Sequence, residues 1–279
     1  YIDQLFVYDK KRNLRNPFSL FKLLSEIRQK KLDLVIVLNT VSFSVTSMLL
    51  AVASGASVRA GVTSRPFGTD LSGRFYHIEL PLPSEQEIER MHESEHNLYP
   101  LAVLGISESD LSSLLVPTAE ESEEAENFLE EEVGDDFLLV HPGAGKAANI
   151  WPAERFAAAA DLLARKYSIR VVAVRGPSDR EAFNRFISSC ALPPVQLVSP
   201  SVGCLGAVMK RAAVTLCNDT GIMHIAGAVG APSVAVFGPT DPDRWKPAVK
   251  SVIAVRAGDR RIESVGVEDV VAAAGSYLS

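Results

Sequence analysis

The second half of the chain alternates between short apolar runs and segments whose apolar residues recur at helical spacing. Strands buried on both faces of a parallel sheet read as continuous apolar runs, whereas the helices that cover such a sheet are apolar on one side only. The pattern therefore predicts an α/β domain with a parallel sheet covered on both faces. The predicted strands are 137–141, 169–174, 195–198, 213–216, 233–237 and 251–255, and the predicted helices are 153–166, 178–189, 203–211, 221–229 and 267–278.

The first part of the chain shows a similar but shorter alternation, typical of half of a Rossmann-like domain. A glutamate-rich segment at 119–132 follows Pro117 and is typical of a connecting helix whose acids face water. We therefore predict two domains, an incomplete one over 1–130 that includes this helix and a second over 131–279. In the first domain the predicted strands are 4–8, 33–39, 57–60 and 75–80, and the predicted helices are 18–30 and 43–54.

The composition is that of a globular protein, with 47% apolar and 22% charged residues in a chain of 279. The longest apolar runs have the length of strands, well short of the roughly 20 residues that span a bilayer, and no signal peptide pattern is present. The three cysteines lack CxxC spacing, and the five histidines lack the spacing of metal ligands. We therefore expect a soluble, cytoplasmic protein with neither a disulfide framework nor a metal site.

The net charge of −6 is unevenly distributed along the sequence. Residues 119–136 hold ten acids and no base, so the remainder carries +4, and lysine and arginine are frequent between Lys10 and Lys31. This basic stretch could suit an anionic acceptor or a membrane surface, and solvated helix faces are the alternative explanation. Because nothing pairs the basic residues with the aromatic pattern of a nucleic-acid binder, we expect no nucleic-acid partner.

The most informative polar positions follow the predicted strand at 213–216, where Asn218, Asp219, Thr220 and Gly221 precede a helix. Asp219 is predicted to cap that helix, and Gly221 lets a ligand approach the backbone. The unpaired N–H groups of a first helical turn favour an anion such as a diphosphate. An ordinary capped turn without a ligand is the alternative, but the similar loop FGPTDP at 237–242 meets the same sheet edge, where ligands of open α/β folds bind.

A second polar loop, HPGAGKAANIWP, lies at 141–152 between the first strand of this domain and its helix. Its glycines suit a close approach of the backbone to an oxyanion, and Lys146 could balance charge on a departing diphosphate. The spacing is not that of a Walker A loop, and a plain strand-to-helix turn with an exposed lysine is the alternative. Trp151 either packs against the helix or stacks on a ligand.

Two further positions complete the candidate site. Glu181, shortly after the second strand, could reach a ribose hydroxyl, although acids are also common at helix starts. His224, in the first turn after Gly221, points either toward the ligand or into the packing. No G-x-G-x-x-G sequence follows a strand, so nicotinamide dinucleotide binding is not expected.

Three runs at these separations, HPGAG…WPAERF, NDTGIMHIA and FGPTDP…W…P, together resemble glycosyltransferase family 9, the lipopolysaccharide heptosyltransferases. The resemblance implies a GT-B architecture, in which two Rossmann-like domains face a cleft, with the donor on the C-terminal domain and the acceptor on the N-terminal one. It implies inverting transfer of L-glycero-D-manno-heptose from ADP-heptose to the lipopolysaccharide inner core, without a cofactor or metal. A glycolipid acceptor further implies peripheral contact with the inner face of a bacterial inner membrane.

Carried over by position, the resemblance places the diphosphate at the loop 143–146 and at 219–221, with adenine near 199–201. The residues implied to bind the donor are Gly143, Ala144, Gly145, Lys146, Asn149, Glu181, Asp219, Thr220, Gly221, Met223 and His224. Asn149 departs from the family, because many members have lysine at this position, and Lys146 could substitute for it.

The family's general base is an aspartate in a Gly-Asp loop that precedes anything like the first residues of this sequence. That residue is therefore expected before residue 1, and we name no catalytic base. The expected activity is glycosyl transfer. The alternatives are a nucleotide-sugar-binding protein without catalysis and a GT-B nucleotide-sugar epimerase or hydrolase.

Overall fold

The computed structural model describes residues 2–9 and 15–278. Contacts between residues divide the chain into two compact units, Tyr1–Ser109 and Asp110–Ser279. Lys10, Lys11 and Arg12 of the basic N-terminal stretch lie outside the described residues. Within the described part, no helix combines the length and the apolar character needed to cross a bilayer.

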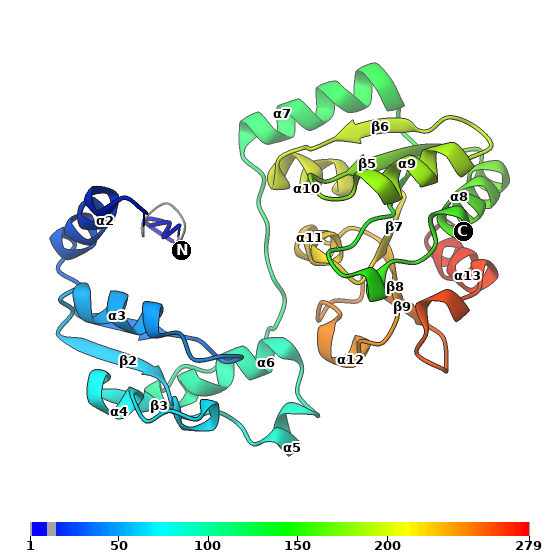
Figure 1. Cartoon of the computed structure of the whole chain (residues 1–279). Helices are drawn as coiled ribbons and strands as arrows, with labels where there is room; N and C mark the ends of the chain where they lie inside the picture. Colours follow the sequence, from blue (N-terminus) through cyan, green and yellow to red (C-terminus); the bar gives the residue numbers. More distant parts are fainter. Residues whose placement is uncertain (1, 10–14, 279) are drawn as a thin grey trace. The chain divides into compact units, whose positions relative to one another are not determined.

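The C-terminal unit contains a parallel six-stranded sheet in the order β6-β5-β4-β7-β8-β9 (Figure 1). Strand order reverses between neighbours β4 and β7, and ligands of open α/β folds bind outside the carboxyl ends of such a pair. The predicted parallel sheet is therefore confirmed. Its strands are β4 (Phe137–His141), β5 (Arg170–Arg175), β6 (Val195–Val198), β7 (Val214–Asn218), β8 (Ser233–Phe237) and β9 (Val252–Arg256).

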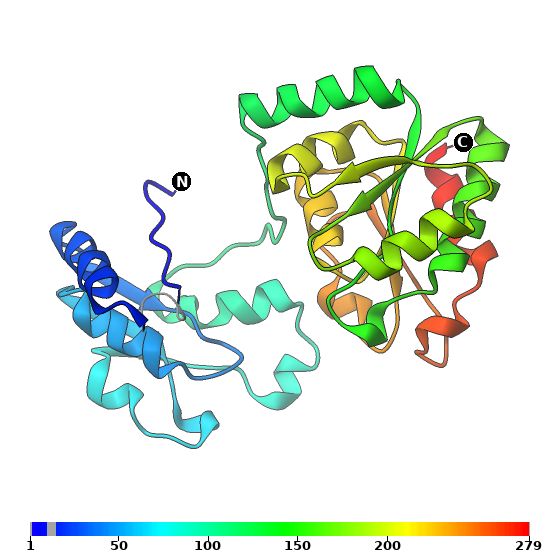
Figure 2. The same cartoon turned by 45° about the horizontal axis from the view of Figure 1, so that its top comes forward.

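Helices cover both faces of this sheet (Figures 1 and 2). Helices α8 (Ala153–Tyr167), α9 (Arg180–Ser189) and α13 (Val267–Leu278) pack on one face, and α10 (Val202–Arg211) and α11 (Gly221–Val229) on the other. The short helix α12 (Pro242–Trp245) and the 3₁₀ turns Ala147–Asn149 and Ile262–Ser264 complete the unit. All five helices predicted from residue 153 onward are present.

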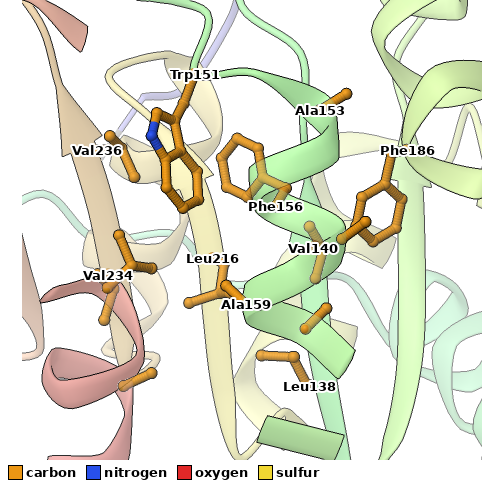
Figure 3. Packing of buried hydrophobic residues seen from close by; sticks show 14 of the residues in the cluster. Leu138, Val140, Trp151, Ala153, Phe156, Ala159, Phe186, Leu216, Val234 and Val236 are labelled. Carbon is orange, nitrogen blue, oxygen red and sulfur yellow. The ribbon is translucent and has the colours of Figure 1, made fainter. Parts of the chain in front are cut away.

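Trp151 lies in the core beneath α8 (Figure 3). It is fully buried, its ring meets Phe156 edge to face with centroids 4.8 Å apart, and its Nε1–H donates to the Val265 carbonyl at 3.2 Å. Since a buried indole needs a partner for its N–H, this contact satisfies the ring without a ligand. Trp151 is thus an anchor of the loop that precedes it, and the stacking alternative does not apply.

The acidic helix α7 (Ala119–Phe128) continues into a π-helical turn at Leu129–Val133 and belongs by its contacts to the C-terminal unit. Ala125 and Leu129 are buried with α10, and Glu126 pairs with Arg211 at 2.7 Å. Most of its acids face water as expected, whereas the half-exposed Glu126 pairs with α10, because a helix that packs on one side brings the acids at the edge of that side near its neighbour. These contacts divide the chain after Ser109, whereas the predicted boundary was residue 130.

The N-terminal unit holds a parallel three-stranded sheet in the order β1 (Leu34–Val37), β2 (Val58–Val62), β3 (Ile78–Leu80). Asn16 caps α2 by accepting from the Phe18 and Ser19 amides. The short elements α4 to α6 and two 3₁₀ turns were not predicted. The helices and turns are α2 (Pro17–Gln29), α3 (Val45–Ala53), Arg65–Phe67, α4 (Ser72–Phe75), α5 (Glu85–Ile88), α6 (Glu93–Leu98) and Tyr99–Leu104.

The strand predicted at 4–8 is absent from the structure. Ile2, Leu5 and Val7 are 82%, 78% and 71% exposed, and the segment pairs with neither β1 nor β3. Alternating apolar residues form a strand only where a neighbouring strand supplies hydrogen bonds and a buried face. This prediction is therefore wrong, because the segment has neither in this structure.

Candidate functional site

Asn218, the last residue of β7, joins the two loops at the point where strand order reverses. Its side chain is fully buried. Its Oδ1 accepts from the Trp151 amide at 2.9 Å, and its Nδ2 donates to the carbonyls of Pro142 and Gly143 at 3.0 and 3.1 Å. Since each buried polar atom finds a partner here, Asn218 fixes the loop after β4 against the end of β7.

Asp219 brings three loops together. Its Oδ2 accepts from Asn149 Nδ2 at 3.0 Å and from Thr240 Oγ1 at 2.6 Å, so the loops after β4, β7 and β8 converge on one carboxylate. The prediction that Asp219 caps α11 is wrong, since Thr220 occupies the N-cap position and no side chain bonds there. The carboxylate is held away from the helix by partners that are distant in sequence.

The N-terminus of α11 is consequently open. Thr220 has extended backbone and makes no side-chain cap, and a Cβ placed on Gly221 would find no heavy atom within 4 Å. The first amides of a helix have no partner inside the helix and carry its positive dipole end. This corner therefore offers uncapped amides, at Gly221 and Ile222, to an anion approaching from solvent.

The glycines of the loop after β4 play two different roles. A Cβ on Gly143 would lie 2.5 Å from Asp179 Cγ, so glycine is required there by the protein's own packing. Gly145 has no heavy atom near its Cβ position, and Lys146 beside it is exposed. The expectation that these glycines admit a ligand thus fits Gly145 alone, and Ala144, half-buried, separates the two.

An open pocket of about 450 Å³ lies between this loop and the start of α9. Gly143, Ala144, Asp179, Glu181 and Arg185 are among the residues that line it. The Glu181 side chain is 81% exposed, and its Oε1 lies 2.7 Å from Arg185 NH2. The structure therefore places Glu181 beside the loop, where it pairs with Arg185.

Two of the predicted site residues differ in exposure. His224 is exposed on α11. Met223 is fully buried and packs with Phe237 and Cys217, so its side chain lies in the core and does not reach the open corner.

Burial, with Asp219 nearby, raises the pKa of the Cys217 thiol to about 12, which excludes a thiolate nucleophile beneath the site.

The loop 199–201, predicted to lie near an adenine, leads into α10. Ser201 caps that helix by accepting from the Cys204 amide at 3.0 Å, and it donates to Glu121 Oε1 at 2.8 Å. Hydrogen bonds from the Thr118 amide and from Ser201 hold the pKa of Glu121 below its usual range. The N-terminus of α10 thus already faces a carboxylate of the protein itself.

The sequence placed Asn218 and Thr240 in loops of the expected site without showing what they bond, and it did not single out Asp179. Asn218 carried a signal, because an asparagine at the end of a fully apolar strand must find buried partners. Thr240 and Asp179 carried none, since their partners are 21 and 38 residues away along the chain. Together these contacts form a corner in which uncapped amides, an exposed lysine and a hydrogen-bonded carboxylate can bind an anionic, hydroxyl-bearing ligand.

Comparison with known proteins identifies related chains. Over 132 residues the sequence is 31% identical to lipopolysaccharide heptosyltransferase 3 of Escherichia coli, covering 46% of this chain and 39% of the relative. The matches span less than half the length of the curated relatives. The structure superposes on the family 9 glycosyl transferase of Veillonella parvula DSM 2008 with a TM-score of 0.78 and 23% identity, covering 92% of this chain and 78% of that one.

The Escherichia coli heptosyltransferase WaaC with ADP superposes with a TM-score of 0.71 and 20% identity, covering 99% of this chain and 84% of that one. At these identities the similarity shows a shared fold, which confirms the expected α/β architecture of the heptosyltransferase structures. The model of one family matches residues 20–271, nearly the whole described sequence. The chain therefore belongs to glycosyltransferase family 9 (heptosyltransferase).

Proposed function

We propose that this chain binds a nucleotide sugar and transfers its sugar with inversion, moving a heptose from ADP-heptose to the lipopolysaccharide inner core or a related glycan. The observation that carries the proposal is the open N-terminus of α11, with Gly221 uncovered, at the reversal of strand order in a family 9 chain. A curated relative is named a lipopolysaccharide heptosyltransferase, and a similar structure contains ADP.

In this proposal the amides of Gly221 and Ile222 and the backbone at Gly145 bind the diphosphate, and Lys146 reaches it from the neighbouring loop. The carboxylate of Asp219 would repel a phosphate, so its role differs from that of the amides. Held by Asn149 and Thr240, it accepts hydrogen bonds from hydroxyl groups of the sugar. The amides therefore bind the leaving group, and Asp219 orients the group that is transferred.

In the transfer, the acceptor hydroxyl oxygen bonds to the anomeric carbon and gives up its proton to a base, while the bond from that carbon to the diphosphate breaks, so negative charge grows on the departing ADP. Fixed amides and a lysine that meet this charge stabilise the transition state more than the ground state. We place Glu181 at the ribose hydroxyls, with adenine toward 199–201 and His224 beside the diphosphate. Thr220 contributes its backbone, since its side chain makes no cap.

We further propose that the unit Tyr1–Ser109 binds the glycolipid acceptor and that the protein works in the cytoplasm at the inner face of the bacterial inner membrane. Basic side chains on and after α2, including Lys22, Arg28 and Lys30, support this arrangement, as do the exposed rings of Phe18 and Phe21, at 77% and 71%. Basic and aromatic side chains together favour the surface of an anionic bilayer.

The test is incubation of the purified protein with ADP-heptose and a lipopolysaccharide core that lacks heptose. We expect ADP to be released in equal amount to the heptosylated core, and Gly221→Glu to abolish both products. Tight binding of ADP-heptose without turnover would instead indicate a nucleotide-sugar-binding protein. Release of free heptose or of an epimer without acceptor would indicate a hydrolase or an epimerase, and absence of ADP binding would refute the proposal.

A further inference from the structure

A buried histidine and a carboxylate meet behind the pocket. His141 is the last residue of β4 and is 2% exposed, and Asp179 immediately precedes α9. His141 Nε2 lies 2.9 Å from Asp179 Oδ2, with side-chain exposures of 3% and 14%. The pair therefore links the loop after β4 to the loop after β5 at the edge of the sheet where the pocket lies.

The proton on His141 can be assigned from its surroundings. His141 Nδ1 is buried and has no hydrogen-bond partner among the described residues. A hydrogen on Nδ1 would lose its bond to water without replacement, so the neutral ring carries its hydrogen on Nε2 and donates it to Asp179. This hydrogen bond, helped by one from the Gly176 amide and opposed by burial, lowers the pKa of Asp179. Asp179 is therefore an anion that accepts from the end of β4 and from the start of its own loop.

The carboxylate also occupies space that two glycines leave empty. Asp179 Cγ lies 2.5 Å from the Cβ position of Gly143, and Asp179 Oδ2 lies 2.6 Å from that of Gly176. Any larger residue at either glycine would displace Asp179. Gly143 is thus held on two sides, by Asp179 against its Cα and by Asn218, which donates to its carbonyl oxygen at 3.1 Å.

Helix capping does not explain this aspartate. Asp179 stands at the N-cap position of α9, yet its side chain makes no hydrogen bond to the first turn. A carboxylate at that position normally accepts from those amides, which stabilises the helix. Here it points back toward β4 and borders the pocket beside Glu181 instead.

We propose that Asp179 is a positioning residue for the donor nucleotide: with His141 it fixes Gly143, and thereby presents Gly145 and Lys146 to the diphosphate. The inference rests on the proposed function, since it concerns the same site. Because Asp179 acts through the loop, its removal changes affinity for the nucleotide without removing a direct contact to the phosphates.

The experiment measures ADP affinity by calorimetry, at a temperature where each variant is folded. We expect Asp179→Ala to weaken binding about tenfold and Asp179→Asn, which keeps the shape and an acceptor for His141, about threefold. Asp161→Ala is the matched control, because Asp161 also accepts from a backbone amide, that of Ala191 at 2.9 Å, but lies away from this pocket. We expect its ADP affinity to equal that of the wild type.

An Asp179→Ala variant that is folded and binds ADP as tightly as the wild type would overturn the inference while leaving the proposed function intact. If Asp179→Ala does not fold, Asp179→Asn decides: weakened ADP binding supports the positioning role, and unchanged binding overturns it. Absence of ADP binding by the wild type would refute the proposed function itself, and this inference with it.

Discussion

Two helices of the C-terminal unit begin at the same edge of the sheet, and they treat their free amides in opposite ways. At α10, Ser201 caps the first turn and also donates a hydrogen bond to Glu121. The carboxylate of Glu121 occupies the space beside Gly203. At α11, Thr220 makes no cap and the space beside Gly221 is empty. The amides of α10 meet a group of the protein, whereas those of α11 remain available to a ligand.

The difference shows how a binding corner can be recognised in a fold with many helix starts. Every helix start carries amides that have no partner within the helix and a positive dipole end, so neither property alone marks a site. Asp219 could cap α11, yet Asn149 and Thr240 hold its carboxylate elsewhere. A potential cap that is held away from its helix indicates that the amides serve something other than stability.

The largest loss of ADP affinity is expected when a carboxylate is placed at the start of α11, as Glu121 is at the start of α10. Gly221→Glu places a carboxylate in the open space, so we expect ADP affinity to fall at least about a thousandfold, or about 4 kcal/mol. Stability should be unchanged or slightly higher, because an acid favours a helix N-terminus. Calorimetry with ADP and thermal unfolding measure both.

Gly258→Glu is the matched control, because Gly258 is equally open and follows the edge strand β9. It adds the same charge after a strand that is separated from β7 by β8, and should leave ADP affinity nearly unchanged. Equal ADP affinity of Gly221→Glu and the wild type would show that the ligand does not use this corner.

The rigidity of the α11 corner should depend on Asn218. Asn218→Ala removes three buried hydrogen bonds and leaves the Trp151 amide without a partner, so we expect the free energy of unfolding to fall by about 3 kcal/mol. Urea denaturation measures the loss. Asn184→Ala, at an exposed position of α9, should change it by less than about 0.5 kcal/mol. Similar losses in the two variants would mean that Asn218 has no special role.

Lys146 should make a smaller contribution to binding. Lys146→Ala should weaken ADP binding about tenfold, and more at low salt, because an exposed lysine acts on the diphosphate through screened charge. Stability should not change. Lys210→Ala, which removes an exposed lysine near the end of α10, should leave affinity as it is. Calorimetry with ADP at two salt concentrations tests the difference, and a Lys146→Ala variant with wild-type affinity would exclude this role.

The smallest effect is on stability, and it concerns the pH-dependent contribution of Glu121 at the α10 corner. The pKa of Glu121 is lowered from its ordinary value of 4.5, so the folded state favours its ionised form. Its contribution to stability is therefore present above that ordinary value and is lost as pH falls through the lower folded pKa. We expect Glu121→Gln to be less stable than the wild type at pH 7, and this difference to shrink between about pH 5 and pH 3.

Parallel thermal unfolding of both proteins across this range tests the expectation, and ADP affinity at pH 7 should be similar in the two. A constant difference in stability across the range would mean that the ionised carboxylate does not stabilise the α10 corner.

Much of the fold could be predicted from the sequence because the C-terminal strands are buried on both faces. Strands such as Phe137–His141 and Ser233–Phe237 are continuous apolar runs, and helix α11 begins at Gly221 as expected. The segment 4–8 has the pattern of a strand as well, but a pattern cannot show whether a neighbouring strand is present.

The sequence predicted the location of the site better than the roles of its individual residues. The two loops and Gly221 lie where expected, since strand order alone brings the ends of β4 and β7 together. The capping role of Asp219 was wrong, and the side chain of Met223, implied to bind the donor, lies in the core instead. Both errors have one cause, which is that side-chain direction depends on contacts between segments distant in the sequence, such as Thr240 with Asp219.

The most direct test of the account is a crystal structure of the protein with ADP. We predict a phosphate of ADP within about 3.2 Å of the Gly221 or Ile222 amide nitrogen, with Lys146 turned toward it and Glu121 still bonded to Ser201. A diphosphate bound at the start of α10 in place of Glu121, or at any position away from α11, would contradict the account.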